Sequence, residues 1–588
     1  MVHLFSLNEL NLVRFLVLAL LRKPLMVLRV APIFTNRTGP LQKFTDWAIR
    51  TGRASYAVTL VPELQHIWDF RDRLNFHDNF KKYEPWQNRY YKFDDVEIAG
   101  DPIYGFTYKQ VTCIYTWRKV IEIYLLDAIE KKLNAGEYSV HGVLEDTLAL
   151  GRDRFGPDFG AHTKPMVYPE AITKLSTLLL AVGFTLTWLA TRMRFSVTTT
   201  EVAVAFESLN DTREFELMNE IKDAGKYLIV YRGPGALSNP QPLPEGMDYT
   251  ECLRKDGLFA PKDALAGAAM AIRHIFRLYR RHWDAPPELL KRMLALPYKR
   301  LLQRGLLNRF RPGYFISRDE YNVDHVLRRA ELRPLGIKSI GISNGFYPYI
   351  ATLTANVRYV GFDTYFVNAA PLFSQYRDTW LEDMEVRTIG TYSLPRDKLS
   401  SVLGARGEDI VFTIRSAWSN PELVRMVRAV AKAFPERMVI LQLKSTKISD
   451  QETERFIVEC GEGLENIQFT TETAYALLER AKFHISDLST FVAEAIFSGA
   501  NTIMADLIDM EFNCYRQFPG LCVITAEELV EKLRALESGR EAYPHHEYFE
   551  LLGCKHGDVG YDLLREEIGL PSLSPSPSQA PEQAHQSV

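Results

Sequence analysis

The segment between residues 409 and 505 constrains the fold more than any other part of the chain. Short apolar runs alternate there with stretches whose apolar side chains recur at helical spacing. The predicted strands are Asp409–Ile414, Arg437–Leu443, Ile467–Thr470, Phe483–Ile485 and Thr502–Ala505, and the predicted helices are Pro421–Phe434, Gln451–Cys460, Thr473–Ala481 and Thr490–Ser498. Strands separated by helices predict a parallel, doubly wound sheet, whose ligands bind beyond the carboxyl ends of the strands.

The first 395 residues show similar strands less regularly, between longer helices and loops. The strand candidates are Leu25–Val30, Tyr56–Val61, Tyr227–Tyr231, Gly313–Ser317, Ser339–Ile342 and Thr364–Val367, and helical patterns include Trp117–Leu133 and Lys262–Arg281. A chain of 588 residues is too long for one hydrophobic core. We therefore predict an α/β fold with two Rossmann-like lobes.

The predicted boundary between the lobes lies near residue 395. The N-terminal lobe would span residues 1–395 and contain helical insertions, among them a basic one at about 262–311. The C-terminal lobe would span residues 396–570. Residues 571–588 are rich in Pro and Ser and contain few large apolar residues, which predicts a disordered tail.

The composition narrows the class of function. A formal net charge of −3 gives no electrostatic reason to expect a nucleic-acid partner. The six cysteines show no C-x-x-C spacing, which argues against a zinc knuckle or a redox pair. No secretory signal is evident, so we expect a cytoplasmic protein that can work at the inner face of the cell membrane.

One segment, Leu175–Thr191, is long and apolar enough to raise the question of a membrane. It runs 17 residues without a charge, between Lys174 and Arg192. That length is at the lower limit for a helix that crosses a bilayer. We favour a helix buried in the protein core, while an interfacial helix and a true membrane span stay open.

The strongest sign of a ligand site is the segment from Asp487 to Glu494. A predicted strand ends at about Ser486, and a helix follows with Ser489 as its N-cap. The first turn of such a helix presents N–H groups and the positive end of its dipole, which suits a phosphate. The hydroxyls of Ser489 and Thr490 add donors, and Glu494 could accept hydrogen bonds from a ribose. The alternative is an ordinary capped helix with a solvated Glu494.

The pattern D-x-S-T-x-x-x-E-A-x-x-x-G, from Asp487 to Gly499, resembles the donor half of GT-B glycosyltransferases. It looks closest to enzymes that build bacterial surface polysaccharides, and it is distantly similar to CDP-glycerol glycerophosphotransferases. The resemblance covers about residues 312–510. It implies that Ser489 and Thr490 contact the donor phosphate and that Glu494 contacts the nucleotide ribose, with Asp487 in the same donor-binding segment.

Two further segments look like the same family. Val411–Ser416 resembles the first strand and loop of the donor lobe, so Arg415 and Ser416 could reach the diphosphate or the acceptor. Leu441–Thr446 resembles a strand that commonly ends in Lys-x-His-Pro in these relatives, and Lys444 fits it. No His-Pro follows, which counts against a glycerophosphotransferase in particular.

The acceptor side of the predicted cleft is less clear. The turn at Ser343, Asn344 and Gly345 would face the cleft at a point where relatives often place a His-Gly pair, so a histidine base is absent there. An acid or base for the transfer must come from another position. Candidates are His141, Glu145, Asp146, Asp319 and Glu320, of which we take Glu145, Asp146 and Asp319 as catalytic candidates.

Metal chemistry has little support in the sequence. No strict Asp-x-Asp pair occurs, and this pair is the usual way in which a GT-A enzyme holds a divalent ion on its donor. Helix dipoles and basic side chains would instead neutralise the diphosphate. We expect no metal and no cofactor, since the nucleotide-activated sugar would be a substrate.

A basic stretch suggests a second kind of partner. Residues Ile272–Arg311 hold 11 Lys and Arg against two acidic residues, with apolar side chains interleaved. Such helices can lie on an anionic membrane surface or near a lipid-linked acceptor. The alternative is the solvated outer face of ordinary helices.

The leading hypothesis is transfer of a sugar from a nucleotide-activated donor to a surface glycan or lipid-linked acceptor. A second reading keeps the fold and changes the transferred group to glycerol phosphate or another polyol phosphate from a CDP-linked donor. A third reading is an inactive protein of the same fold that binds glycans or scaffolds an assembly. The missing histidines motivate the third and count against the second.

Overall fold

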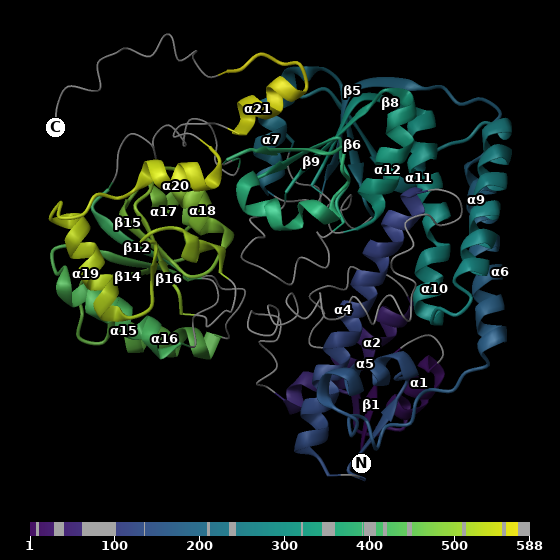
Figure 1. Ribbon diagram of the computed structural model, residues 1–588, viewed down its shortest axis with the longest axis horizontal. Helices are drawn as coiled ribbons and strands as arrows, with labels where there is room; N and C mark the ends of the chain where they lie inside the picture. Colours follow the sequence, from purple (N-terminus) through teal and green to yellow (C-terminus); the bar gives the residue numbers. More distant parts are fainter. Residues whose placement is uncertain are drawn as a thin grey trace. The chain divides into compact units, whose positions relative to one another are not determined.

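The computed structural model contains three parallel β-sheets with helices between their strands (Figure 1). It describes residues 1–7, 11–28, 40–61, 102–134, 136–208, 212–233, 243–318, 322–343, 359–390, 392, 407–414, 420–443, 450–507, 513–554 and 560–573. The chain forms two compact units. One is Met1–Phe195, Phe259–Leu301 and Thr352–Tyr359, and the other is Ser196–Leu258, Leu302–Ala351 and Val360–Val588.

The first unit holds a four-stranded sheet in the order β3-β2-β1-β4. Its strands are β1 (Val2–Phe5), β2 (Leu25–Val27), β3 (Ser55–Tyr56) and β4 (Tyr138–His141), and its helices are α1 (Leu12–Leu20), α2 (Pro40–Arg50), α4 (Pro102–Lys132) and α5 (Glu145–Phe155). Phe5, Phe15, Val27 and Ala48 form a common core between the sheet, α1 and α2. The carboxyl ends of β1 and β4 lie side by side, because Phe5 pairs with His141.

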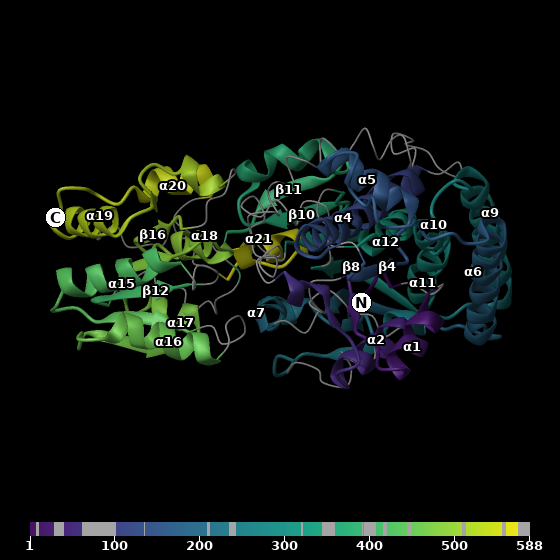
Figure 2. The same ribbon diagram turned by 90° about the horizontal axis from the view of Figure 1, so that it is seen from below.

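A group of helices completes this unit. They are α6 (Glu170–Arg192), α9 (Pro261–Arg281), α10 (Pro287–Leu294) and the first part of α11 (Leu296–Arg309). A proline occupies the first turn of both α9 and α10, where its missing N–H costs no helical hydrogen bond. Helices α6 and α9 run side by side in both views (Figures 1 and 2).

The second unit holds a seven-stranded sheet in the order β11-β10-β9-β8-β5-β6-β7. Its strands are β5 (Thr200–Ser208), β6 (Tyr227–Tyr231), β7 (Tyr249–Leu253), β8 (Phe310–Ser317), β9 (Lys338–Ile342), β10 (Thr364–Val367) and β11 (Glu385–Thr388), and its helices include α7 (Thr212–Ile221) and α12 (Asp324–Leu332). The last helix of the chain, α21 (Gly560–Glu567), belongs to this sheet, because Tyr561 and Leu564 are buried in one core with Phe206 and Ile316.

The same unit holds a six-stranded sheet in the order β14-β13-β12-β15-β16-β17. Its strands are β12 (Asp409–Thr413), β13 (Val439–Gln442), β14 (Ile467–Thr470), β15 (Ala481–Ser486), β16 (Thr502–Ala505) and β17 (Cys522–Val523). Its helices are α15 (Pro421–Ala433), α16 (Asp450–Gly461), α17 (Ala474–Leu478), α18 (Thr490–Phe497), α19 (Ala526–Glu537) and α20 (His545–Leu552).

The side chains of β12 alternate between two apolar layers of this sheet. Ile410 and Phe412 pack with α15, α16 and α19, whereas Val411 packs with Leu477 of α17. In Figure 1, α17 and α18 accordingly lie on one side of the strands and α15 and α16 on the other. Both faces of the sheet are covered, as a doubly wound parallel sheet requires.

The predicted α/β class with parallel, doubly wound sheets is confirmed. Every strand predicted between residues 409 and 505 is present, with bounds that shift by a few residues. The boundary predicted near residue 395 and most of the tail, residues 574–588, lie outside the described residues, so those two predictions stay predictions.

The strands of the N-terminal half differ from the expectation in several places. The strand predicted over Tyr56–Val61 is reduced to β3, since a 3-10 turn occupies Ala57–Leu60. Strands β1, β4, β7 and β11 were not predicted. Nor was the inner strand β5, although it pairs with both β6 and β8. Its sequence contains two alanines and two glutamates, which favour strands poorly, and burial between two neighbours overrides that local preference.

The expectation of a buried core helix at Leu175–Thr191 is wrong. Helix α6 covers this segment, and only 28% of its most apolar window is buried. It is the one helix within the described ranges that is long and apolar enough to cross a membrane. One side of α6 has partners in the protein, while Leu179, Leu180 and Phe184 on the other side are exposed.

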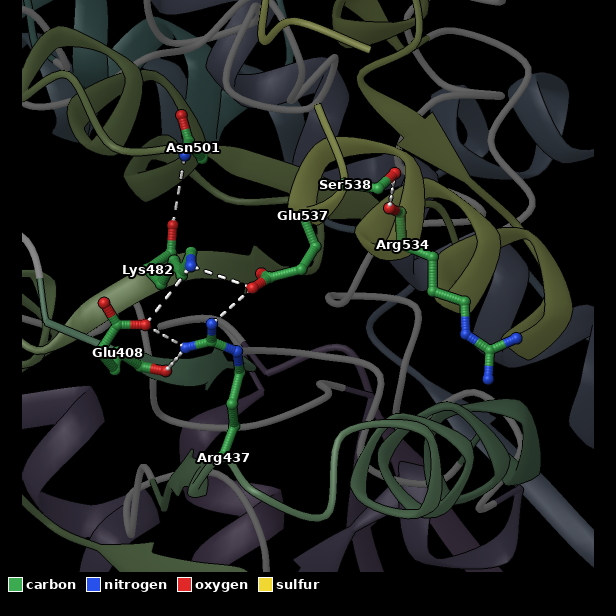
Figure 3. Close-up of polar contacts among 7 residues, drawn as sticks. All are labelled: Glu408, Arg437, Lys482, Asn501, Arg534, Glu537 and Ser538. Carbon is green, nitrogen blue, oxygen red and sulfur yellow. Dashed lines mark hydrogen bonds and ion pairs between the residues drawn. The ribbon is translucent and has the colours of Figure 1, made fainter. Parts of the chain in front are cut away.

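Four charged side chains tie together the amino edge of the six-stranded sheet (Figure 3). Arg437, just before β13, lies 2.6 Å from Glu537 of α19 and forms a short ion pair with Glu408, just before β12. Lys482 of β15 lies 3.1 Å from Glu537 and 3.4 Å from Glu408. These contacts lower the pKa of Glu408 through the hydrogen bond from Arg437, so the carboxylate stays ionised.

The substitution Arg437→Met should loosen this edge. We expect a loss of about 1 kcal/mol of local stability, since networks of partly exposed ion pairs are worth little more. Amide hydrogen exchange in β12 and β13 of the full chain should therefore accelerate by roughly fivefold. Because the pKa values of Glu408 and Glu537 are lowered, their contribution is present above their ordinary value of 4.5 and is lost below it.

Arg534→Met is a matched control for this prediction. Arg534 lies on α19 like Glu537, and its guanidinium points away from the network (Figure 3). Its substitution should leave exchange in β12 and β13 unchanged. Equal effects of the two substitutions, or a difference that does not shrink as the pH is lowered progressively below 4.5, would contradict the assignment.

Candidate functional site

The turn after β15 lies at the point where the strand order of the six-stranded sheet reverses. From β12 the chain adds β13 and β14 on one side, and from β15 it adds β16 and β17 on the other. The carboxyl ends of β12 and β15 are neighbours, because Thr413 pairs with Ser486. Such a reversal opens a crevice beside the strand ends, which is where doubly wound sheets bind ligands. The predicted donor segment is therefore at the expected place in the sheet.

Hydroxyl groups fix the backbone of this turn. The Ser486 hydroxyl lies 3.0 Å from the carbonyl oxygen of Thr413, which bridges the two strand ends. It also lies 3.3 Å from the hydroxyl of Ser489. Ser486 and Asp487 are fully buried, and Ser489 is nearly so. The turn is thus held rigidly by the sheet before any ligand binds.

Helix α18 begins as predicted, with Ser489 as its N-cap. The Ser489 hydroxyl accepts a hydrogen bond from the Phe491 amide at 3.2 Å. Tyr515 reinforces the same end, because its hydroxyl donates to the Ser489 carbonyl at 2.8 Å and accepts from the Ala493 amide at 3.3 Å. The Phe491 and Ala493 amides therefore already have partners. An anion at this end of α18 would interact with the helix dipole and with the hydroxyls of Ser489 and Thr490.

Glu494 is buried, in contrast to the alternative prediction that its side chain is solvated. Only 3% of the residue is exposed, and the hydroxyl of Tyr475 donates a hydrogen bond to its carboxylate. The Tyr475 ring packs edge-on against Phe491, with 5.0 Å between ring centres. A buried carboxylate is costly unless it is hydrogen-bonded, so this residue is held in place rather than left in solvent.

His484 of β15 links three strands just before the turn. Its Nε2 lies 2.8 Å from the Thr413 hydroxyl on β12, and its Nδ1 lies 3.4 Å from the Thr502 hydroxyl on β16. Complete burial lowers the pKa of His484 to about 3, so the ring is neutral at physiological pH. A neutral ring can donate through one nitrogen and accept through the other, as this position between two hydroxyls requires.

A hollow of about 450 Å³ opens at the carboxyl edge of the same sheet. Its lining residues are Asn420, Glu422, Asp506, Leu507, Arg516, Ile524 and Thr525. Asp506 follows β16 and accepts a hydrogen bond from Arg516 at 2.7 Å. This volume falls in the range of small-molecule sites. Arg516 adds a half-exposed cation to the edge, which the sequence reading did not single out.

Several predicted site residues lie outside the described residues. They are Asp319 and Glu320, Asn344 and Gly345 of the predicted cleft loop, and Arg415, Ser416 and Lys444 of the predicted donor loops. Ser343 follows β9 and is fully buried, with its amide bonded to the Phe366 carbonyl at 2.8 Å. The roles assigned to these residues stay predictions.

The two described catalytic candidates lie in the first unit, at the start of α5 after β4. Glu145 is exposed and forms an ion pair with Arg152. Asp146 is buried and accepts a hydrogen bond from the Tyr115 hydroxyl at 3.0 Å. His141, at the end of β4, has its pKa lowered to about 4 by burial and by Arg14 and His3. The structure therefore separates two adjacent carboxylates into a solvated one and a buried one.

A second polar cluster, which the sequence reading missed, lies where the order of the seven-stranded sheet reverses. Glu207 at the end of β5 accepts from the Ser317 hydroxyl at the end of β8, at 3.0 Å. Arg328 lies 2.7 Å from the same carboxylate, and Arg254 forms a short ion pair with it. Burial raises the pKa of Glu207, but the guanidinium groups outweigh it and hold it at about 2. The signal in the sequence was a glutamate closing the apolar run Val202–Phe206.

No group of three or more His, Cys, Asp or Glu side chains that could hold a metal ion occurs among the described residues. The six cysteines form no disulfide, and Cys113, Cys252, Cys460 and Cys514 are buried. Burial raises the pKa of the Cys252 and Cys460 thiols to about 12, so they remain protonated.

Comparison with known proteins gives matches in structure only. No family model and no curated protein sequence matches the chain. Solved structures that it resembles include UDP-GlcNAc 2-epimerase from Neisseria meningitidis bound to UDP-GlcNAc, at 10% identity and a TM-score of 0.37, over 63% of this chain and 99% of that one. Os79 from O. sativa in complex with UDP matches at 13% identity and a TM-score of 0.37, over 62% of this chain and 99% of that one. The α,α-trehalose 6-phosphate synthase from Burkholderia multivorans matches at 12% identity and a TM-score of 0.36, over 63% of this chain and 96% of that one. TM-scores below 0.5 leave the substrate of this chain open.

The neutral state of His484 can be checked directly. Because its pKa is lowered to about 3, the ring should show no titration between pH 8 and pH 5 in ¹H–¹³C NMR spectra of labelled histidine. The same chain unfolded in urea, in which histidines titrate near about 6.5, serves as the control. The unfolded state binds the proton first, so His484 should weaken the fold as the pH falls below about 6.5. A titration of His484 near neutrality would contradict the buried link.

Proposed function

We propose that the protein is a metal-independent glycosyltransferase that moves a sugar from a nucleotide-activated donor to a surface-glycan or lipid-linked acceptor. One observation carries the proposal: the segment Asp487–Glu494 lies where the order of a parallel sheet reverses. A helix N-terminus with two hydroxyl side chains and a buried carboxylate lie together there. This combination offers groups for both the phosphate and the ribose of a nucleotide.

The phosphates would lie at the first turn of α18. Ser489 and Thr490 would donate to phosphate oxygens, and the helix dipole would stabilise the charge that develops on the leaving diphosphate. The conformation of the turn supports this role, since Ser486 and Tyr515 already hold it and little ordering is left to binding. A preorganised site spends less of its binding free energy on fixing its own groups.

Glu494 would hold the ribose. It lies one turn into α18, and the Tyr475 hydroxyl occupies part of its hydrogen-bonding capacity. An ionised carboxylate has about four acceptor positions, so it can accept from ribose hydroxyls as well. The predicted roles of Arg415, Ser416 and Lys444 at the donor, and of Glu145, Asp146 and Asp319 in proton transfer, complete the proposal.

Glu494→Gln should weaken nucleotide-sugar binding by roughly 10- to 100-fold, because a hydrogen bond to a charged group is worth about 1.5–3 kcal/mol. Isothermal calorimetry with UDP-sugars is the first measurement, since UDP is the nucleotide in several of the structural neighbours. Tyr475→Phe is the matched variant, which removes one hydrogen bond to Glu494 and leaves its carboxyl group in place. Its effect on affinity should be smaller.

The site assignment is wrong if the Glu494→Gln variant binds the UDP-sugar with unchanged affinity and has an unchanged circular dichroism spectrum. Ser489→Ala is less diagnostic on its own, because loss of the N-cap costs about 1 kcal/mol of helix stability as well. Its thermal stability without ligand must therefore be measured beside its affinity.

A panel of labelled donors separates the proposed transferase from its two alternatives. Nucleotide sugars and CDP-glycerol are incubated with the full chain and a crude glycan or lipid acceptor fraction. Transfer from a nucleotide sugar supports the proposal, and transfer from CDP-glycerol alone replaces it with the polyol-phosphate reading. A bound nucleotide at 100 times its dissociation constant adds about 2.7 kcal/mol of stability. No thermal shift with any nucleotide would favour the inactive binding protein.

A further inference from the structure

Helix α6 presents an uncharged apolar face that the described part of the protein leaves largely exposed, although Phe184 packs edge-on against Tyr298. Its large exposed side chains are Ile172, Leu175, Leu179, Leu180, Phe184 and Leu186, which we call the outer face. Leu180 is 72% exposed and Phe184 59%. Their spacing places them on one side of the helix. Between Glu170 and Arg192 the one charged residue is Lys174, which is buried on the opposite side.

The apolar surface continues beyond the outer face. Phe195, shortly after α6, is fully exposed, and Val167, shortly before it, is 90% exposed. Helix α9 runs beside α6 and adds Leu265 and Phe276, both exposed. A helix on the surface of a soluble protein normally presents charged and polar groups on the side away from the core. Large exposed apolar side chains gathered on one helix and its neighbour are typical of an interaction site.

The opposite face of α6 packs against the first unit. These contacts decide whether the helix can cross a bilayer or must lie along its surface. Lys174 forms an ion pair with Glu170 and donates to the carbonyl oxygen of Trp283. Trp188 packs edge-on against Tyr298 and Phe259, with ring centres 5.4 and 5.8 Å apart. A helix that crossed a bilayer would have to give up these contacts. The geometry fits a helix that stays packed on α9 and lies along a surface.

The charges beside the outer face indicate the partner. The second half of α9 carries exposed arginines at 273, 277, 280 and 281 and no acidic residue. Trp283 follows, half exposed, with Tyr279 packed against it at 5.1 Å between ring centres. Arginines and a Trp–Tyr pair next to an apolar face match the headgroup layer of an anionic membrane. A second copy of the chain fits less well, since a two-fold interface would bring like charges together.

We propose that the outer face of α6 docks the protein onto an anionic lipid surface. The apolar side chains enter the boundary between headgroups and acyl chains, and the arginines of α9 contact the headgroups. This surface differs from the apolar residues of the basic stretch first considered, because Ile275, Leu289, Leu290 and Met293 there are core residues. The inference does not depend on the proposed transferase, since lipid binding needs no donor.

Co-sedimentation of the full chain with lipid vesicles tests the proposal. The chain should bind vesicles that contain phosphatidylglycerol and bind pure phosphatidylcholine much more weakly. Combining Leu179→Gln, Leu180→Gln and Phe184→Gln should weaken binding by about tenfold or more, because apolar burial supplies most of the affinity. The matched control is Val458→Gln on α16, which changes an exposed aliphatic residue elsewhere and should bind like the parent chain.

The electrostatic half of the proposal has its own variant. Arg273→Gln with Arg280→Gln should weaken binding to anionic vesicles several-fold and reduce its sensitivity to salt. Circular dichroism and thermal melting of each variant show that it is folded, so that lost binding reports the surface itself.

Three results would overturn the proposal. The first is a parent chain that does not sediment with anionic vesicles, and the second is a triple variant that binds as well as the parent. The third is vesicle-bound protein that resists extraction by alkaline carbonate, which would indicate a membrane span. A parent chain that ignores vesicles and is dimeric by light scattering, with a monomeric triple variant, would assign the outer face to a second copy.

Discussion

The parallel pairing of β12 with β15 is the constraint on which the candidate site depends. Thr413 and Ser486 are register partners at the carboxyl ends of these strands, and the Ser486 hydroxyl bonds to the Thr413 carbonyl. Because the sheet grows in opposite directions from this pair, its topology favours a crevice beyond these two strand ends. The segment from Asp487 to Glu494 enters that space with a fixed backbone. The proposed phosphate and ribose contacts all follow from this one pairing.

The two edges of the six-stranded sheet handle charge differently. The amino edge neutralises its charges internally, since Arg437 and Lys482 face Glu408 and Glu537 across four elements (Figure 3). The carboxyl edge buries His484, which is neutral because its pKa is lowered, and Glu494, whose carboxylate accepts a hydrogen bond from Tyr475. The carboxyl edge also holds an ion pair, Asp506 with Arg516, so the proposal of binding at this edge rests on the strand-order reversal and not on unpaired charge.

The fold was predictable where local signals agree with tertiary packing. The strands from β12 to β16 are short apolar runs with helices of clear periodicity between them, and both patterns survive in the structure. Strand β5 escaped because its alanines and glutamates favour strands poorly, and its central place comes from pairing with β6 and β8. Glu207, at the end of β5, was missed for the same reason. Its polar cluster forms only through Ser317 and Arg328, which come from distant parts of the chain.

The sequence by itself determined the α/β class, the N-cap at Ser489 and the position of a strand end before Asp487, because these depend on neighbours within a few residues. Tertiary structure decided which side chains are exposed. It buried Glu494 against Tyr475 and left Leu180 and more than half of Phe184 on α6 exposed. An apolar helix and a carboxylate look the same in sequence whether or not they have a partner. A residue is buried when another group packs against it. For Glu494 that group is Tyr475 from another helix, and for Leu180 the described part of the chain provides none.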